Sequence, residues 1–268
     1  MSENTYLTSV DAKPRRDRTP VWSEALTMMS RALRLSLRNV DALTTAFVLP
    51  VLLMLMFVYL FGGAIHTGTS YVDYVVPGVL LVCVSFGAST TAVTVAHDLT
   101  GAVIDRFRSI DVRGESLISG HVVASVARNA LSSALALAVA VAIGFRAHGS
   151  FESCLAAGAL LILFVLALSW FAAAIGILVQ SPEAAQGIAF LVSFLAYPSS
   201  AFVPIHTMPS WLQDFASRQP VTAVADATRA LLNGTPVGAS AWHAVAWSVA
   251  IMIVSVALAG AMFRRRTS

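Results

Sequence analysis

The chain has 268 residues, of which 57% are hydrophobic and 12% are charged, whereas ordinary soluble domains contain about 25% charged residues. This composition excludes an ordinary soluble domain and indicates a membrane protein. The net charge of +3 does not indicate nucleic-acid binding, because the basic residues lie at the edges of apolar blocks rather than on one folded face.

The first 40 residues are polar or amphipathic, and we expect no secretory signal sequence in them. Residues 1–20 include two prolines, which is typical of a disordered cytoplasmic tail. In residues 21–40, apolar side chains recur every three or four positions from Trp22 to Leu37, and arginines take the other side. This pattern predicts an amphipathic helix at the cytoplasmic membrane surface. A surface helix of a soluble domain is the alternative, although no such domain follows.

Residues 41–268 contain six apolar blocks, and a helix needs about 20 residues to cross about 30 Å of hydrocarbon. We therefore predict an all-α membrane protein with six transmembrane helices. The predicted spans are Ala42–Ala64, Tyr74–His97, Leu117–Phe145, Ser153–Gln180, Ala184–Val203 and Trp242–Phe263.

Lysine and arginine are unevenly distributed between the segments that join these blocks. With both termini in the cytoplasm, thirteen of them lie inside and three lie outside, namely Arg146, Arg218 and Arg229. Because cytoplasmic segments carry the excess of positive charge, we expect both termini inside. The same orientation places residues 98–115 in the cytoplasm and residues 204–240 outside.

Residues 98–115 form a compact charged stretch between the second and third blocks. Each charge would cost roughly 2.5–3.5 kcal/mol at a bilayer centre, so the stretch lies outside the lipid. Apolar side chains recur at helical spacing from Val103 to Ile110, which predicts a short amphipathic helix that contacts a separate soluble motor. The residues assigned to this coupling contact are Ile104, Asp105, Arg106, Phe107, Arg108 and Ile110.

The outer segment 204–240 is cut by prolines into pieces that are too short to cross a bilayer. Its apolar edges predict short re-entrant helices that dip into the outer leaflet and return, with their backbone sheltered by protein or water. A plain surface loop is the alternative. The residues selected in and just before this segment are Phe202, Pro204, Met208, Pro209, Trp211, Leu212 and Pro220.

No catalytic or metal-binding motif is found: the sequence lacks HExxH and G-x-S-x-G, and its histidines lie mostly near span ends. Cys83 and Cys154 lie inside apolar runs, which favours buried apolar residues over a disulfide or metal site. A nucleotide-binding P-loop ends in Gly-Lys-Ser/Thr, but the one lysine, Lys13, precedes a proline. The chain therefore cannot be its own P-loop ATPase, and we expect it to bind no metal or cofactor.

Arg128 is the one charge well inside an apolar block. Intramembrane arginines usually face a partner or a water-filled cavity, which makes a transport role possible. Snorkelling to the inner surface, or bracing Asn129 and neighbouring carbonyls, are the alternatives. The second and fifth spans also offer aromatic and hydroxyl groups suited to a drug-like ligand, although helix seams contain the same residue types. This cavity set is Phe86, Ser89, Thr90, Thr91, Phe190, Phe194 and Tyr197.

Two stretches closely resemble the permease subunits of type-2 ABC exporters of the daunorubicin-resistance kind. The likeness rests on the Arg-Phe-Arg core at Arg106–Arg108 and on the series Phe202–Pro204, Met208–Leu212 and Gln219–Val221. It implies two permease subunits, identical or closely related, each docked on a cytoplasmic ATP-binding subunit that holds ATP and Mg. It further implies that the helix in residues 98–115 couples the permease to the ATP-binding subunit, and that the short re-entrant helices of residues 204–240 cap the exit. Asp111 departs from the family pattern, in which Leu-Pro follows the core.

Three functions follow as hypotheses. The first is an ATP-driven exporter permease that moves an amphiphilic, drug-like or lipid-like compound outward. The second is a permease of the same family that exports a polysaccharide or glycolipid. A tunnel for a glycan would have aromatic rings along its length to stack on the sugars, and the five tryptophans all lie near the interfaces, which disfavours this function. The third is a gradient-driven carrier or intramembrane enzyme, against which the lack of intramembrane carboxylates argues. Sixteen arginines against one lysine indicate a GC-rich bacterial genome and hence a bacterial inner membrane.

Overall fold

The computed structural model describes residues 40–63, 65, 70–100 and 114–267, and every regular element in these ranges is helical. This confirms the all-α class for the described part of the chain. The predicted tail 1–20, nearly all of the interfacial helix 21–40 and the coupling helix lie outside the described residues. The long helices are α2 (Val40–Met56), α3 (Tyr71–Thr100), α5 (Gly114–Ala142), α6 (Phe151–Leu178) and α10 (Ser240–Thr267). The shorter elements are η1 (Phe57–Phe61), α7 (Pro182–Ser193), η2 (Phe194–Ala196), η3 (Ile205–Thr207), α8 (Ser210–Arg218) and α9 (Pro220–Asn233).

Within the described residues, four helices are long and apolar enough to cross a membrane. They are Tyr71–Leu99, Ile118–Ala142, Phe151–Leu178 and Ser240–Met262, and they correspond to the predicted second, third, fourth and sixth spans. Lipid offers the backbone no hydrogen-bond partners. These apolar blocks therefore fold as continuous helices, in which the backbone groups bond to one another.

Shorter apolar stretches, Phe47–Phe61 and Pro182–Ala196, overlap the predicted first and fifth spans. The helix of the first block runs without a break from Val40 in α2 to Phe61 in η1. At a rise of about 1.5 Å per residue, Pro182–Ala196 covers about 23 Å, less than the roughly 30 Å of hydrocarbon. The fifth block was expected to continue to Val203, but its helix ends at Ala196 and a turn follows around Pro198. A proline cannot supply the backbone N–H that a continuing helix needs. Six spans therefore stay a prediction.

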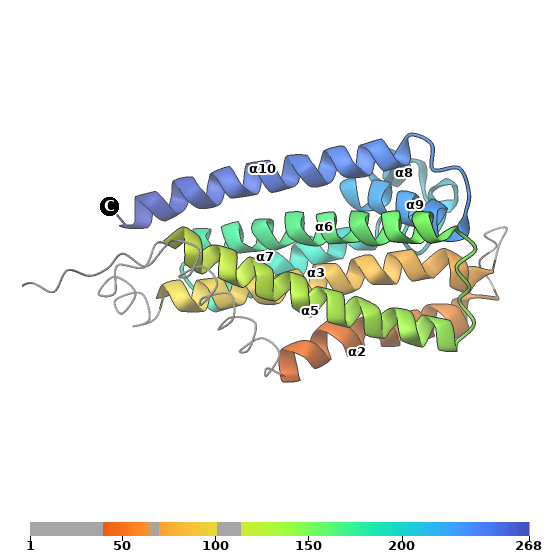
Figure 1. Cartoon of the computed structure of the whole chain (residues 1–268), viewed down its shortest axis with the longest axis horizontal. Helices are drawn as coiled ribbons and strands as arrows, with labels where there is room; N and C mark the ends of the chain where they lie inside the picture. The colour runs from red at the N-terminus through yellow and green to blue at the C-terminus, as the bar shows by residue number, and fades with distance from the viewer. Residues whose placement is uncertain (1–39, 64, 66–69, 101–113, 268) are drawn as a thin grey trace, which may run out of the picture.

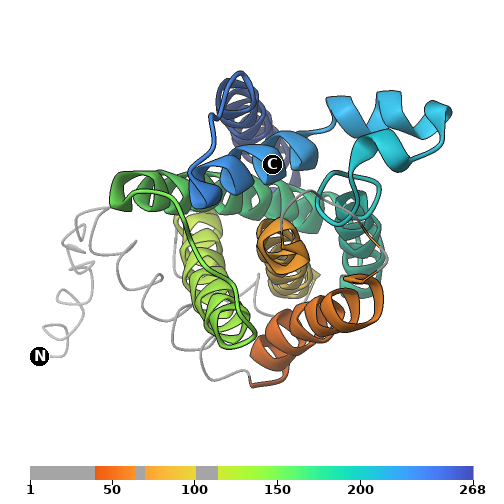
Figure 2. The ribbon, with the colours of Figure 1, turned by 90° about the vertical axis from the view of Figure 1, so that its right-hand side faces the viewer.

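Helix α3 is the centre of the bundle. Figure 2 shows it end-on, with α2, α5, α6 and α7 around it and with α10 packed on the far side of α6. Residues 74–88 of α3 are buried without interruption, as expected for a helix that is apolar on all sides. The chain therefore places its most enclosed helix directly before the predicted coupling loop.

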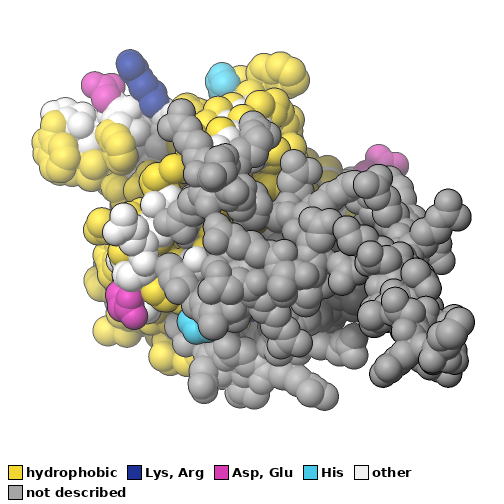
Figure 3. Space-filling model, turned by 90° about the vertical axis from the view of Figure 1, so that its left-hand side faces the viewer, with side chains coloured by type: hydrophobic (Ala, Val, Ile, Leu, Met, Phe, Trp, Pro, Cys, Tyr) yellow, Lys and Arg dark blue, Asp and Glu magenta, His cyan; other side chains and the backbone are white. Residues whose placement is uncertain are grey.

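Helix α10 is the opposite case, because it lies along one side of the bundle (Figure 1) and leaves apolar side chains such as Ile253 and Leu258 exposed. Where described side chains are visible in Figure 3, most of them are hydrophobic. The exposed apolar side chains along α10 suit lipid rather than water.

Small residues bring α3 and α6 into close contact. A Cβ atom built on Gly176 of α6 would lie 2.5 Å from the carbonyl oxygen of Ala92 and 2.9 Å from the Cβ of Val95. Buried alanines, including Ala88 and Ala172, continue the seam. Small side chains are what allow membrane helices to approach this closely.

We expect Gly176→Val to destabilise the bundle by about 1–3 kcal/mol, because the added side chain would meet backbone that cannot move aside. The matched control is Gly158→Val on the same helix, where an added Cβ meets no atom within 4 Å. Thermal unfolding of both variants in detergent is the measurement. Equal melting temperatures for the two variants would contradict this packing.

Candidate functional site

The six coupling residues lie in residues 101–113, outside the described part of the chain, but the helices on either side are described. Helix α3 reaches Thr100 and α5 begins at Gly114. Close to this point, His121 Nε2 lies 3.0 Å from Asp98 Oδ2, which links α5 to α3. The two helices that would carry a coupling loop are thus joined beside it.

Arg128 forms a second link between the same helices, deeper in the bundle. Its side chain is 6% exposed, and its Nη2 donates to the carbonyl oxygen of Gly87 at 3.1 Å and to Thr91 Oγ1 at 2.9 Å. The guanidinium group therefore points toward α3 rather than to the inner surface. Of the predicted alternatives, bracing of a carbonyl is the one observed, and the carbonyl belongs to α3 rather than to its own helix.

Polar side chains next to Arg128 extend the link to α6. The Asn129 amide donates to the carbonyl oxygen of Ser125 at 2.9 Å, and Ser169 Oγ on α6 donates to Ser125 Oγ at 2.9 Å. Any Cβ at Gly87 would overlap the Asn129 amide. Three neighbouring helices are thus joined by hydrogen bonds at one level of the bundle.

The predicted aromatic residues of α3 and the fifth block lie in a row. The ring centroids of Phe86 and Phe190 are 6.4 Å apart, those of Phe190 and Phe194 are 4.8 Å apart, and those of Phe194 and Tyr197 are 5.2 Å apart. Phe190 and Phe194 are 48% and 47% exposed. Sequence reasoning therefore selected rings that do lie together, on a surface that is partly open.

The row continues through rings that sequence reasoning did not assign to it. Tyr197 stacks on Phe202 at 5.6 Å, Phe202 on Phe57 at 4.7 Å, and Phe57 lies 5.5 Å from Phe61. Phe202 had been placed with the outer segment, and Phe57 and Phe61 of η1 were missed. Their spacing of four residues was the available signal. We call these seven residues the aromatic row: Phe86, Phe190, Phe194, Tyr197, Phe202, Phe57 and Phe61.

The hydroxyl groups predicted beside the rings are used within the protein. Ser89 Oγ lies 2.9 Å from Ser193 Oγ and so joins α3 to α7. Thr90 Oγ1 donates to the carbonyl oxygen of Gly87 at 2.8 Å, within its own helix. The aromatic row therefore offers mainly carbon surface.

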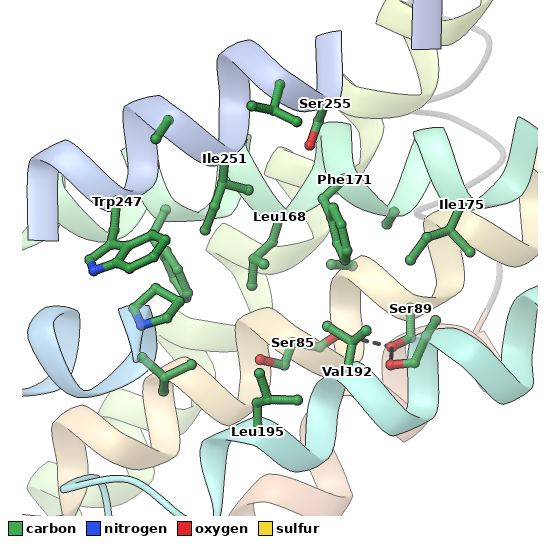
Figure 4. Close-up of a pocket in the computed structure, with 18 residues that line it drawn as sticks. Ser85, Ser89, Leu168, Phe171, Ile175, Val192, Leu195, Trp247, Ile251 and Ser255 are labelled. Atoms are coloured by element: carbon green, nitrogen blue, oxygen red, sulfur yellow. Dashed lines mark hydrogen bonds between the residues drawn. The ribbon is translucent and has the colours of Figure 1, made fainter. Parts of the chain in front are cut away.

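A separate pocket of about 390 Å³ lies between α3, α6, α7, α9 and α10 (Figure 4). Of the predicted cavity residues, all of which are described, Ser89 lines this pocket and the others do not. We call it the α7–α10 pocket, after the two helices that form its walls. Its lining includes Phe164, Phe171, Leu195, Trp247, Ile251 and Ser255.

The outer segment forms the short helices that its prolines predict. Pro209 precedes α8 and Pro220 is the first residue of α9, a position where a missing N–H is harmless. These helices contain 9 and 14 residues, too few to cross a bilayer. Trp211 is exposed. Of the other selected residues, Phe202 is buried and Pro204, Met208 and Leu212 are partly buried.

Arg229 of α9 holds this segment to the bundle, a role that sequence reasoning missed. Its Nε donates to the Tyr74 carbonyl at 3.0 Å, its Nη2 to the Ser200 carbonyl at 2.6 Å, and its Nη1 to Asp226 Oδ1 at 2.6 Å. The guanidinium carbon lies 3.9 Å from the centre of the Tyr74 ring. The available signal was the Asp226–Arg229 pair, one helical turn apart.

The four long apolar helices of the described residues define a multi-span α-helical membrane protein. The family model for ABC-2 family transporter proteins matches residues 66–263. The chain belongs to this family, which confirms the resemblance found in the sequence.

Two named relatives agree with this assignment. The chain is 31% identical over 230 residues to the "Daunorubicin resistance ABC transporter permease protein DrrB1" of Streptomyces coeruleorubidus, which covers 85% of this chain and 81% of the relative. It is 21% identical over 248 residues to the "Probable doxorubicin resistance ABC transporter permease protein DrrC" of Mycobacterium tuberculosis, which covers 92% of this chain and 90% of the relative. Both are named as permeases of drug-resistance transporters.

We expect Arg229→Ala to lower the stability by about 2–4 kcal/mol, because it removes several charge-assisted hydrogen bonds and a cation–π contact at once. Arg218→Ala, on the exposed surface of α8, is the matched control and should change stability by no more than about 0.5 kcal/mol. Thermal unfolding in detergent measures both. An Arg229→Ala variant that melts with the control would show that Arg229 does not hold α9 in place.

Proposed function

We propose that the chain is the permease subunit of an ATP-driven exporter that moves an amphiphilic, drug-like or lipid-like compound outward across a bacterial inner membrane. Membership of the ABC-2 family and the names of the two relatives support this class. The aromatic row is the observation that supports an amphiphilic cargo, because stacked rings with few polar groups suit ligands that are largely apolar.

In this proposal the energy comes from a cytoplasmic ATP-binding subunit, which holds ATP and Mg. The sequence lacks a P-loop, and the loop 98–115 is the proposed contact, with Phe107 and Ile110 filling a groove and the neighbouring charges setting register. Both chain termini are then cytoplasmic. The links at Asp98–His121 and Arg128–Gly87 support a mechanism in which α3 and α5 respond together to a push at this loop.

A second permease copy, identical or closely related, is the other proposed partner. Phe190 and Phe194 are each about half exposed, and a facing copy would turn this open surface into a shared cavity between two aromatic rows. Surrounding lipid would close the remaining sides.

The hydroxyl groups beside the aromatic row favour an amphiphile over a glycan. A sugar chain presents many hydroxyl groups, and each loses a hydrogen bond to water unless the protein replaces it. The hydroxyl groups of Ser89 and Thr90 already have partners within the protein.

We expect Phe107→Ala combined with Ile110→Ala to leave the protein in the membrane but to abolish its co-purification with the ATP-binding subunit, because both apolar contacts of the coupling helix are lost. Pull-down of the co-expressed subunits and stimulated ATP hydrolysis are the measurements. Trp211→Ala, at an exposed site on α8, is the control and should still bind the partner. Retained, stimulated ATPase activity in the double variant would refute the coupling role.

We expect Phe190→Ala combined with Phe194→Ala to reduce ATP-driven efflux of an aromatic dye by roughly 5- to 160-fold, because each ring contributes about 0.5–1.5 kcal/mol of stacking. Binding of the ATP-binding subunit should be unchanged. Leu191→Ala is the matched control, since Leu191 follows Phe190 in the sequence and is 67% exposed but is not part of the aromatic row. Equal efflux in all three proteins would show that the row does not contact cargo.

A further inference from the structure

The α7–α10 pocket has a closed floor and an open side. Its floor consists of buried residues of α3 and α6, such as Ala88, Phe164 and Ala172. Its rim is exposed: Trp247 is 43% exposed and Val254 is 63% exposed, both on α10. The pocket therefore opens sideways, between α7 and α10, rather than toward either end of the bundle.

The pocket lies in the middle of the span, where it faces hydrocarbon. Along α10 it extends from Trp247 to Ser255, about 12 Å at the helical rise of about 1.5 Å per residue. It begins about 10 Å from Ser240, where the candidate span Ser240–Met262 starts. An opening at this depth leads to lipid chains and not to water or headgroups.

The lining is almost entirely carbon surface, and its polar side chains are Ser85, Ser89, Trp247 and Ser255. Ser85 Oγ donates to the carbonyl oxygen of Leu81 at 2.9 Å, and Ser89 Oγ is hydrogen-bonded to the carbonyl oxygen of Ser85 and to Ser193 Oγ. Water or a polar group in such a site would lose hydrogen bonds without replacement, and apolar cavities accordingly stay dry and accept apolar ligands.

The size of the pocket selects the kind of apolar occupant. An apolar cavity of about 150 Å³ holds one benzene molecule, and this pocket has about 390 Å³. A helix about 10 Å wide would need roughly 900 Å³ over the same 12 Å length. The pocket therefore has room for one hydrocarbon chain but not for a helix of another protein.

We propose that the α7–α10 pocket binds one acyl chain of a membrane phospholipid. The bound chain fills the space between α10 and α7, which the protein's own side chains leave open. This site lies apart from the aromatic row and does not depend on the proposed function, because a phospholipid would occupy it whether or not cargo is transported.

The first test is native mass spectrometry of the full chain purified from membranes in detergent. Ala250→Phe places a ring in the pocket, and Ala257→Phe places the same ring on the exposed surface of α10 outside it. We expect the wild type and Ala257→Phe to retain one phospholipid per chain and Ala250→Phe to lose most of it. All three should elute as one species in gel filtration.

Retention of phospholipid by Ala250→Phe at the wild-type level would overturn the proposal, as would a wild type that retains none. Equal loss in both variants would also overturn it, since it would indicate lipid held around the whole surface. Recovery of a non-phospholipid amphiphile in place of phospholipid would assign the pocket to another ligand.

A second test uses the fluorescence of Trp247 and does not depend on filling the pocket. A protein with Trp247 as its one tryptophan is purified from vesicles of acyl-brominated phosphatidylcholine and moved into unbrominated lipid. We expect quenching to persist, because the bound chain exchanges slowly. A protein with Trp242 alone, which is exposed and does not line the pocket, should recover fully. Full recovery in both proteins would refute a bound chain.

Discussion

The hydrogen bonds of Arg128 to α3 are the constraint on which the bundle depends. A charged side chain within a membrane span is costly unless it has polar partners, and here the partners are the Gly87 carbonyl and the Thr91 hydroxyl. The absence of a side chain at Gly87 allows α5 to approach closely enough, because any Cβ would overlap the Asn129 amide. Removing one member of such a set leaves the others buried and unsatisfied.

The hydrogen bonds of Arg128 join the central helix α3 to α5, the next long helix in the chain. Because α3 and α5 are linked both at Arg128 and at the Asp98–His121 contact, a displacement of one helix acts on the other. The aromatic row begins on α3, at Phe86, within one turn of Gly87. The Thr100 end of α3, which precedes the proposed coupling loop, is therefore connected through one well-bonded helix to the surface proposed for cargo.

The sequence predicted those features that depend on local pattern. Hydrophobic length found the long spans, and prolines marked the ends of α8 and α9. The aromatic residue types of the second and fifth spans selected Phe86, Phe190 and Phe194, which do lie in one row. Long-range contacts could not be predicted in this way. Phe202 joins the row by stacking on a ring of η1, and the α7–α10 pocket exists because α10 packs on α6 and leaves α7 apart.

Helix α7 separates two apolar surfaces of different chemistry. Successive residues turn by about 100° around a helix, so Phe190 and Phe194 face the aromatic row while Ala189 and Val192 line the pocket. Between them, Ser193 is buried against Ser89 of α3, with the two hydroxyl oxygens 2.9 Å apart. This contact closes α7 onto α3 along the line where the two surfaces would otherwise meet. Flat rings and flexible hydrocarbon chains can therefore be held by the same helix without competing for one site.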